Sequence, residues 1–119
     1  MGYKIDKPWG YEIIFAKTKK YVGKILFVKE REELSLQFHR KKDETIFISK
    51  GSINLFWGDG PSRLSKIIMK SGDSFHIPPN MVHKMHATKD TFIFEVSTPE
   101  IKDVVRLEDK YGRADKKAS

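Results

Sequence analysis

The sequence predicts an all-β domain, built as a small barrel or a double-sheet sandwich. Short apolar runs recur along the chain, and turn-forming residues separate them. The breaks fall at Gly51, Gly72, residues 58–61 (Gly-Asp-Gly-Pro) and residues 78–80 (Pro-Pro-Asn). These residue types favour tight turns. Many short strands with frequent breaks are typical of small barrels and double-sheet sandwiches.

Each predicted strand is a run of β-branched, aromatic or aliphatic residues that ends at such a break. In chain order, the predicted strands are Tyr11–Phe15, Tyr21–Val28, Leu34–His39, Thr45–Ser49, Ile53–Trp57, Leu64–Met69, Ser74–Ile77 and Thr91–Ser97.

The end of the chain differs from the rest. The stretch 97–100 (Ser-Thr-Pro-Glu) has a capping residue, an early proline and a glutamate three places after Ser97, as helix starts often do. Ile101, Val104 and Val105 follow at helical spacing. We therefore expect a short C-terminal helix from about Pro99 to Lys110. We expect one domain over residues 1–113 and a polar tail over residues 114–119.

Length and composition exclude several classes of protein. The chain has 119 residues, which fits one domain. No apolar run approaches the ~20 residues of a membrane span, and the N-terminus lacks an apolar signal core, so we expect a cytoplasmic protein with no membrane partner. Cysteine is absent, which excludes disulfides, thiolate metal sites and a cysteine nucleophile.

The formal net charge is +7, from 23 basic and 16 acidic residues. The basic residues are spread over residues 17–20, 40–42 and 110–117, and no RNA-binding aromatic pattern or helix-turn-helix pattern accompanies them. We therefore do not expect a nucleic-acid partner. An anionic small substrate and solvated lysine faces are the two interpretations that remain.

The first candidate site lies in a predicted hairpin over residues 34–51. Alternation along its first strand puts Ser35, Gln37 and His39 on one face. A polar turn then returns the chain so that Glu44 lies beside His39. An amide oxygen, an imidazole and a carboxylate on one surface are candidate metal ligands.

A second candidate segment runs from Gly72 to His83. Its Pro-Pro-Asn turn reverses the chain and delivers His83 early in a strand, where a second imidazole would complete a set of four ligands. Taken singly, each of these four residues is better interpreted as part of a solvated face or as a surface histidine than as a metal ligand.

The spacing of these residues resembles a known family. The second half of the first cupin motif is similar to residues 39–51, in which four residues separate His39 from Glu44 and six separate Glu44 from Gly51. The second cupin motif is similar to residues 72–83, in which five residues separate Gly72 from Pro78 and His83 follows.

Two positions depart from the general cupin pattern. Gln37 stands where the first motif normally has a histidine, and Asn80 stands where the second normally has a glycine. Asparagine tolerates a positive φ better than most residues do.

Three further segments resemble one branch of the cupins, the cupin domain of type II mannose-6-phosphate isomerases. They are PWGYE (residues 8–12), SLQFH (35–39) and VRLEDKYGR (105–113). That domain is often fused behind a mannose-1-phosphate guanylyltransferase, and it also carries glutamine at the first ligand position. The resemblance implies a cupin fold, a jelly-roll barrel of the double-stranded β-helix type.

The resemblance also implies one divalent metal ion held by Gln37, His39, Glu44 and His83. Two imidazoles and oxygen donors suit Zn, Mn, Fe, Ni or Co. The implied reaction is aldose–ketose isomerisation of a sugar phosphate through an enediol, with mannose-6-phosphate and fructose-6-phosphate as the first candidates.

Glu95 and Lys24 are candidate catalytic residues. Glu95 lies in an apolar strand, which is unusual for a carboxylate unless it faces a pocket, and burial would raise its pKa into a range useful to a general base. The alternative is a rim residue paired with a lysine. Lys24 interrupts an apolar run, which fits either a residue of a polar substrate pocket or an edge-strand charge that blocks aggregation.

Arg113 and Trp9 are candidate substrate-binding residues. A guanidinium group binds phosphate through two parallel hydrogen bonds, which makes Arg113 the first choice for a phosphate contact. Trp9 would stack on the sugar or pack in the core.

The strand that carries the first candidate site also predicts a partner chain. If Gln37 and His39 face inward, then Leu34, Leu36 and Phe38 face outward and need a cover. A second chain would supply it and form a homodimer; the N-terminal strand or the C-terminal helix is the alternative.

Two other functions fit the sequence. One is a non-catalytic sugar or sugar-nucleotide binding cupin. The other is a different cupin enzyme, either a sugar epimerase or a dioxygenase. Gln37 argues against the dioxygenase, because those cupins usually show three histidines and a glutamate.

Overall fold

The computed structural model describes residues 3–114, and its regular elements are β-strands. Of the expected tail over residues 114–119, residues 115–119 lie outside the described part. In chain order the strands are β1 (Tyr3–Lys7), β2 (Gly10–Lys17), β3 (Val22–Val28), β4 (Leu36–Phe38), β5 (Glu44–Lys50), β6 (Ser52–Gly58), β7 (Leu64–Lys70), β8 (Ser74–Ile77), β9 (Val82–Ala87), β10 (Thr91–Ser97) and β11 (Val105–Glu108).

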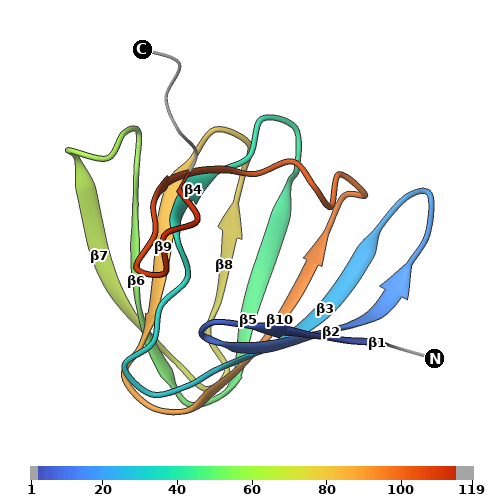
Figure 1. The fold of residues 1–119 in the computed structure, drawn as a ribbon, viewed down its shortest axis with the longest axis horizontal. Coiled ribbons are helices and arrows are strands. Elements are labelled where there is room, and N and C mark those ends of the chain that lie inside the picture. Colours follow the sequence, from blue (N-terminus) through green and yellow to red (C-terminus); the bar gives the residue numbers. More distant parts are fainter. Residues whose placement is uncertain (1–2, 115–119) are drawn as a thin grey trace.

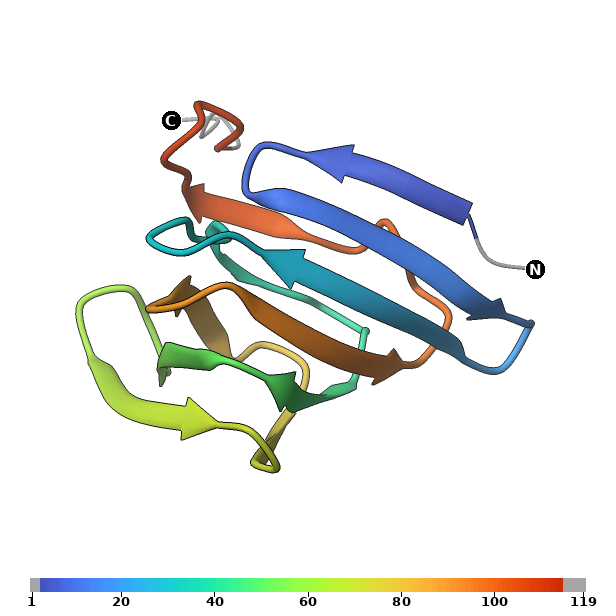
Figure 2. The ribbon, with the colours of Figure 1, turned by 90° about the horizontal axis from the view of Figure 1, so that it is seen from below.

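The strands form two antiparallel sheets that face each other (Figures 1 and 2). One sheet has six strands in the order β1-β2-β3-β10-β5-β8, and the other has five in the order β11-β4-β9-β6-β7. Strand β10 lies between β3 and β5, and β9 lies between β4 and β6, so segments distant in sequence alternate within each sheet. This two-layer jelly roll confirms the predicted all-β class.

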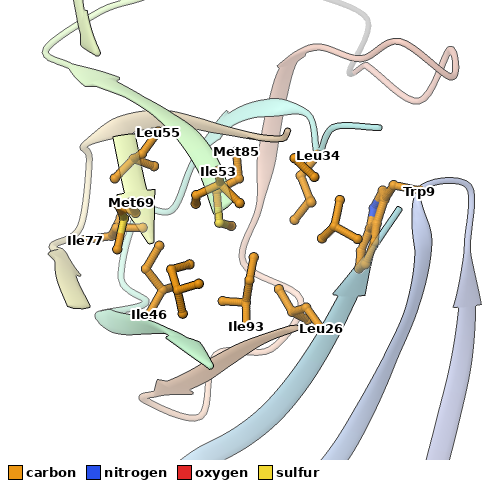
Figure 3. Close-up of a cluster of buried hydrophobic side chains, with 13 residues drawn as sticks. Trp9, Leu26, Leu34, Ile46, Ile53, Leu55, Met69, Ile77, Met85 and Ile93 are labelled. Carbon is orange, nitrogen blue, oxygen red and sulfur yellow. The ribbon is translucent and has the colours of Figure 1, made fainter. Parts of the chain in front are cut away.

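The core fills the space between the two sheets (Figure 3). Alternation along the strands sends Ile46 and Ile93 inward from the six-stranded sheet, and Ile53 and Leu55 inward from the five-stranded sheet. All four side chains are fully buried. The apolar core occupies one end of the sandwich, and the polar side chains discussed below extend from it toward β1, β2 and the segment before β11.

Most of the predicted strands are present within a few residues of their predicted bounds. The strand predicted over Leu34–His39 is shorter and spans Leu36–Phe38. The prediction missed β1 and β11, and it gave no bounds for β9.

The helix predicted from about Pro99 to Lys110 is wrong. Residues 99–104 form tight turns, in which the Ile101 amide donates to the Pro99 carbonyl at 2.7 Å, and β11 follows. Strand β11 pairs with β4, with Val105 opposite Phe38 and Arg106 opposite Gln37. This pairing satisfies the backbone groups at the edge of β4, and such tertiary pairing overrides a weak local helical pattern. None of the described residues forms a helix long and apolar enough to cross a membrane.

Candidate functional site

Two distant segments of the chain bring the predicted ligands together. Gln37 on β4 and His83 on β9 are direct register partners, so they lie side by side in the five-stranded sheet. The turn before β9 is fixed to the end of β4, because the Asn80 amide donates to the His39 carbonyl at 2.7 Å. Asn80 has a φ of 69°, as its place in the turn requires.

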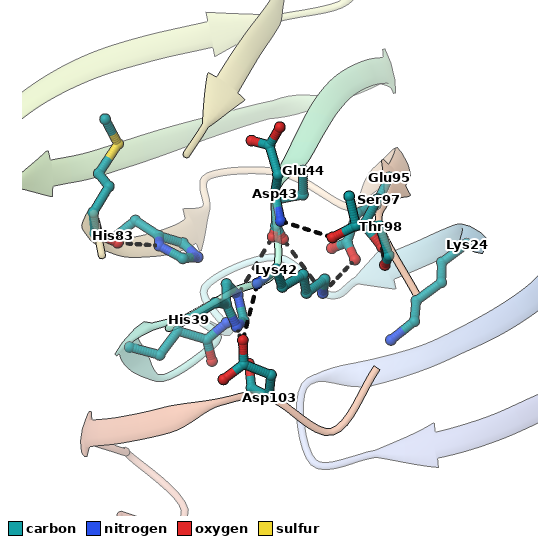
Figure 4. A network of polar contacts seen from close by, with 12 residues as sticks. Lys24, His39, Lys42, Asp43, Glu44, His83, Glu95, Ser97, Thr98 and Asp103 are labelled. Atoms are coloured by element: carbon teal, nitrogen blue, oxygen red, sulfur yellow. Dashed lines mark hydrogen bonds and ion pairs between the residues drawn. The ribbon is translucent and has the colours of Figure 1, made fainter. Parts of the chain in front are cut away.

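Glu44 reaches the same place from the opposite sheet. It opens β5, and its Oε2 atom lies 3.4 Å from Nε2 of His39 (Figure 4). The three ligand atoms of His39, Glu44 and His83 lie within 4.8 Å of one another. All three residues are buried.

The hydrogen bonds of the two histidines leave their facing nitrogens free. Nδ1 of His39 donates to the Asp103 carbonyl at 2.5 Å, and Nδ1 of His83 donates to the Met81 carbonyl at 3.0 Å. A carbonyl accepts only, so Nδ1 carries the proton and Nε2 presents a lone pair. Histidine ligands of metal ions are usually oriented in this way.

Three buried polar atoms at this place have no hydrogen-bond partner: Nε2 of His39, Oε2 of Glu44 and Nε2 of His83. Lone pairs that face one another in a buried site are costly unless a cation lies among them. Two imidazole nitrogens and a carboxylate oxygen are a donor set that fits a divalent first-row metal ion. The residues therefore fit the metal that the fold family implies.

The electrostatics of the group favour the forms that bind a metal. Burial would raise the pKa of the Glu44 carboxyl, but neighbouring groups, with the positive charge of Lys42 among them, lower it to about 2. Burial lowers the pKa of His83, which favours the neutral imidazole. An ionised carboxylate and a neutral imidazole are the protonation states that metal ligation needs.

Gln37 is the fourth predicted ligand, and its side chain lies at the wall of the adjoining cavity. Its Oε1 atom accepts a hydrogen bond of 2.5 Å from the Ser35 hydroxyl. A carbonyl oxygen has a second lone pair, so this bond leaves one free for another contact.

Glu95 and a lysine that the sequence did not single out lie beside the group. Nζ of Lys42 donates to Oε2 of Glu95 at 3.0 Å, and it lies 3.5 Å from Oε1 of Glu44. Both Lys42 and Glu95 are buried. Burial and the nearby Glu44 carboxylate raise the pKa of Glu95, although Lys42 opposes this. Burial alone would lower the pKa of Lys42, but Glu95 and Glu44 outweigh it and raise that pKa.

A cavity of about 350 Å³ opens in front of these residues. Its wall includes His39, Gln37 and Glu95, so the ligand group and the candidate base both border the same space. Seven cationic side chains line it: Lys7, Lys17, Lys24, Lys42, Lys102, Arg106 and Arg113. The carboxylates in the wall belong to Glu12 and Glu95, so the cavity has a large excess of positive charge.

The remaining predicted site residues, Lys24, Arg113 and Trp9, also line this cavity, and their contacts differ. Lys24 is buried and lies 3.5 Å from Oε2 of Glu12, a second buried residue that the sequence did not single out. Arg113 holds Asp109 in a two-point contact, with Nε and Nη2 each 2.9 Å from a carboxylate oxygen. That contact uses two of the five guanidinium N–H groups. Trp9 is buried in the core cluster and also forms part of the cavity wall.

Leu34 and Leu36 do not need a second chain as a cover. Both are buried within the single chain, and Leu34 belongs to the core cluster. Leu34 lies before β4, so the alternation assumed for residues 34–39 does not extend to it. These two leucines therefore give no argument for a dimer.

A family described as mannose-6-phosphate isomerase C-terminal matches residues 1–109. The chain belongs to this family. This confirms the resemblance to the cupin domain of mannose-6-phosphate isomerases. The chain is also 26% identical over 115 residues to the xanthan biosynthesis protein XanB of Xanthomonas campestris pv. campestris (strain B100). That match covers 92% of this chain, which spans about a quarter (24%) of the length of XanB.

Solved structures show that this member of the family has the cupin fold. An RmlC-like cupin from Shewanella frigidimarina NCIMB 400 matches with a TM-score of 0.73 and 14% identity, over 86% of this chain and 87% of that one. KdgF from Halomonas sp. matches with a TM-score of 0.72 and 16% identity, over 84% and 90%. The capsular polysaccharide assembling protein CapF from Staphylococcus aureus matches with a TM-score of 0.75 and 15% identity, over 92% and 35%.

Proposed function

We propose that this cupin is a metal-dependent isomerase that interconverts an aldose phosphate and a ketose phosphate. The observation that carries the proposal is the group of three buried, unpartnered ligand atoms of His39, Glu44 and His83 next to a cationic cavity. Mannose-6-phosphate and fructose-6-phosphate are the first substrates to test, because the chain belongs to the mannose-6-phosphate isomerase C-terminal family.

The proposed metal ion is divalent and is one of Zn, Mn, Fe, Ni or Co. His39, Glu44 and His83 would hold it, and Gln37 would add an amide oxygen. When bound, such an ion polarises the carbonyl of an open-chain sugar and makes the neighbouring carbon more acidic. Glu44 is the one anionic ligand of this set, so a divalent ion would keep a net positive charge.

Glu95 is the proposed general base. In the aldose-to-ketose direction, its carboxylate takes the proton from carbon 2, and an enediolate forms as a proton moves from the hydroxyl at carbon 2 to the oxygen at carbon 1. The Glu95 carboxyl then returns its proton to carbon 1 to give the ketose. A buried carboxyl with a raised pKa is suited to both halves of this transfer.

Lys42 keeps the Glu95 carboxylate in place for this step. Its ammonium group is 3.0 Å from one Glu95 oxygen, which leaves the other oxygen for the substrate. The cationic wall supports the phosphate part of the proposal. A phosphate monoester carries close to two negative charges at neutral pH, and Lys7, Lys24 and Arg113 line the cavity that would receive it.

The test is metal analysis of the purified protein followed by a coupled isomerase assay. We expect about one divalent ion per chain, turnover of mannose-6-phosphate, loss of turnover with a chelator and recovery on adding the metal back. Turnover that is unchanged after the metal has been removed would contradict the mechanism.

One observation favours a non-catalytic alternative. The only hydrogen bond that Glu95 makes among the described residues is to Lys42, and a tight ion pair weakens a base. In that case the cavity would bind a sugar phosphate without converting it. Isothermal titration with mannose-6-phosphate in D₂O, followed by mass analysis of the recovered sugar, separates the two. An isomerase exchanges deuterium into the sugar, and a binding protein does not.

A further inference from the structure

A buried ion pair of Glu12 and Lys24 borders the cavity, and the proton transfers proposed above do not use it. Glu12 is on β2 and Lys24 is on β3, and both side chains line the cavity. Nζ of Lys24 lies 3.5 Å from Oε2 of Glu12, and both residues are buried. Lys7 on β1 approaches the other Glu12 oxygen, at 3.9 Å. The cavity therefore has a second acid–base pair besides that of Lys42 and Glu95.

The two acid–base pairs are neighbours in the sheet. Lys24 is the register partner of Glu95, which lies on the adjacent strand β10 (Figure 4). Register partners in antiparallel strands have their β-carbons about 4.5–5.5 Å apart. Charges of opposite sign thus alternate across the inner face of the sheet, from Glu12 through Lys24 and Glu95 to Lys42. A sugar whose carbon 2 lies at Glu95 has its carbon 1 close to Lys24, because the two carbons are one bond apart.

Stability alone is a poor explanation of the Glu12–Lys24 pair. Burying two charges costs about as much as their attraction returns, and apolar residues of similar volume are often as stable. The contact is also loose, since 3.5 Å exceeds the roughly 2.7–2.9 Å of a usual charge-assisted hydrogen bond. Among residues 3–114 it is the single polar contact of the Lys24 ammonium. An ammonium group has three N–H donors, so two remain for a molecule in the cavity.

The charge of the pair indicates which part of a sugar phosphate it would meet. A phosphate group carries close to two negative charges, and the Glu12 carboxylate repels it. An ammonium and a carboxylate side by side instead offer one donor and one acceptor with no net charge, which suits neutral oxygens. Carbon 1 of a closed sugar ring carries both kinds of oxygen, since its hydroxyl donates and the ring oxygen accepts.

The proposed isomerisation requires chemistry at these two oxygens. A hexose phosphate in water is almost entirely a closed ring, whereas proton transfer between carbons 1 and 2 requires the open chain. Opening the ring needs an acid at the ring oxygen and a base at the carbon 1 hydroxyl. Both oxygens are bonded to carbon 1, so one pair with its atoms 3.5 Å apart is able to contact both.

We propose that Lys24 and Glu12 open the ring of the sugar phosphate as acid and base, in an activity separable from isomerisation. The bond between carbon 1 and the ring oxygen breaks, and that oxygen keeps the electron pair and takes a proton from Nζ of Lys24. A Glu12 oxygen takes the proton of the carbon 1 hydroxyl, whose electron pair becomes the second bond of the carbonyl. The proton then passes from Glu12 to the Lys24 amine, so the pair is restored with no net gain or loss of protons. The inference rests on the proposed function for its substrate class.

Ring opening has a readout of its own. Closure of the open chain gives either anomer, so a protein that opens the ring speeds exchange between the α and β anomers of mannose-6-phosphate without isomerising it. Exchange NMR of the sugar labelled with ¹³C at carbon 1 measures this rate. Glu95→Gln is the parent protein for the test, because it lacks the proposed base of isomerisation and should leave the sugar unconverted. We expect anomer exchange at least about tenfold above the spontaneous rate in the same buffer.

Two variants of this parent test the assignment to the pair. Glu12→Gln removes the base and should return anomer exchange to the spontaneous rate. Glu12→Leu combined with Lys24→Met replaces both charges by apolar side chains of similar size, which a fold usually tolerates, and should have the same effect. The matched control is Glu33→Gln combined with Lys84→Met, which removes an ion pair of 3.6 Å away from the cavity and should keep the full exchange rate.

The outcomes separate this proposal from the proposed isomerase. Anomer exchange at the spontaneous rate in the Glu95→Gln parent would overturn ring opening, even if the wild type isomerises the sugar. Fast exchange that persists without Glu12 and Lys24 would overturn the assignment to this pair, as would an equal loss in the control. Fast exchange in a wild type that shows no isomerisation would support ring opening and contradict the isomerase.

Discussion

The ammonium group of Lys42 lies 3.0 Å from a carboxylate oxygen of Glu95, and both side chains are buried. The same Nζ atom lies 3.5 Å from Oε1 of Glu44, whose other oxygen faces His39. One lysine therefore compensates two buried carboxylates. It also directs one Glu44 oxygen toward itself, which leaves the other for the ligand group.

Replacing Lys42 by methionine should destabilise the metal-free protein strongly. The substitution leaves Glu44 and Glu95 buried without their compensating charge, and breaking a buried ion pair from one side costs about 3–5 kcal/mol. Urea unfolding measures the change in the free energy of unfolding. Lys41→Met is the control, because Lys41 is an exposed neighbour in the same turn and its loss should cost less than about 0.5 kcal/mol. Equal effects of the two variants would contradict the role given to Lys42.

Glu95→Gln should separate catalysis from metal binding. The amide keeps the shape of the side chain but cannot take up a proton, and loss of a general base typically costs about 10²–10⁴ in kcat. Metal content should stay at the wild-type value, because Glu95 is not in the ligand group. The control is Glu33→Gln, which removes a carboxylate paired with Lys84 away from the cavity and should keep full kcat. A Glu95→Gln variant with wild-type kcat would rule out Glu95 as the base.

His39→Ala should lose the metal ion, with affinity reduced more than about 100-fold, because it removes a ligand rather than a residue that orients one. Gln37→Ala should also reduce the affinity for the metal ion. His86→Ala is the control, since His86 lies three residues after His83 in β9 but is not in the ligand group. Metal analysis after dialysis against a weak chelator gives the result. Retention of metal by His39→Ala at the wild-type ratio would contradict the assigned site.

The relative positions of the candidate ligands follow from the sequence to different degrees. Alternation from Gln37 to His39 and one turn to Glu44 are local features, so their relative positions follow from strand geometry. His83 is distant in sequence, and only its motif spacing placed it with the others. Its approach depends on the Asn80–His39 backbone bond, which no local pattern encodes.

Two residues show what local patterns leave out. Lys42 lies in a charged run that resembles a solvated turn, and its burial follows from Glu95, which lies in a strand 53 residues away in sequence. The one local indication was that Lys42 lies two residues before Glu44, because side chains two residues apart point to the same side of an extended backbone. Val105 lies at helical spacing in the sequence, yet in the structure it is part of β11, which pairs with the edge of β4. Both outcomes were decided by tertiary contacts.

The ion pair of Asp109 and Arg113 predicts a pH dependence of stability. Hydrogen bonding to Arg113 holds the pKa of Asp109 below its ordinary value of 3.8. The folded state therefore binds fewer protons than the unfolded state just below that value, so the stabilisation is complete at higher pH and is lost as pH falls through the folded pKa. Asp109→Asn should lower the free energy of unfolding at pH 6, and its difference from wild type should shrink below about pH 4. Urea unfolding across this range measures it, and a difference that does not change with pH would contradict the ion-pair explanation.

Asp103 should affect metal affinity although it touches no metal ligand with its carboxylate. That carboxylate accepts the backbone N–H groups of Lys41 at 2.6 Å and Lys42 at 2.9 Å, while the Asp103 carbonyl accepts from Nδ1 of His39. It therefore fixes the turn that joins His39 to Glu44.

Asp103→Ala removes the carboxylate oxygens but keeps the backbone carbonyl that accepts from His39, so the turn should loosen. We expect a loss of about 1 kcal/mol in stability, as for a lost helix cap, and a roughly tenfold loss of metal affinity. Asp103→Asn keeps one acceptor oxygen and should lie between Asp103→Ala and wild type. Titration of the metal-free variants with Zn²⁺ gives the affinities. Wild-type affinity in Asp103→Ala would show that the Asp103 carboxylate is not needed to hold His39 and Glu44 in place.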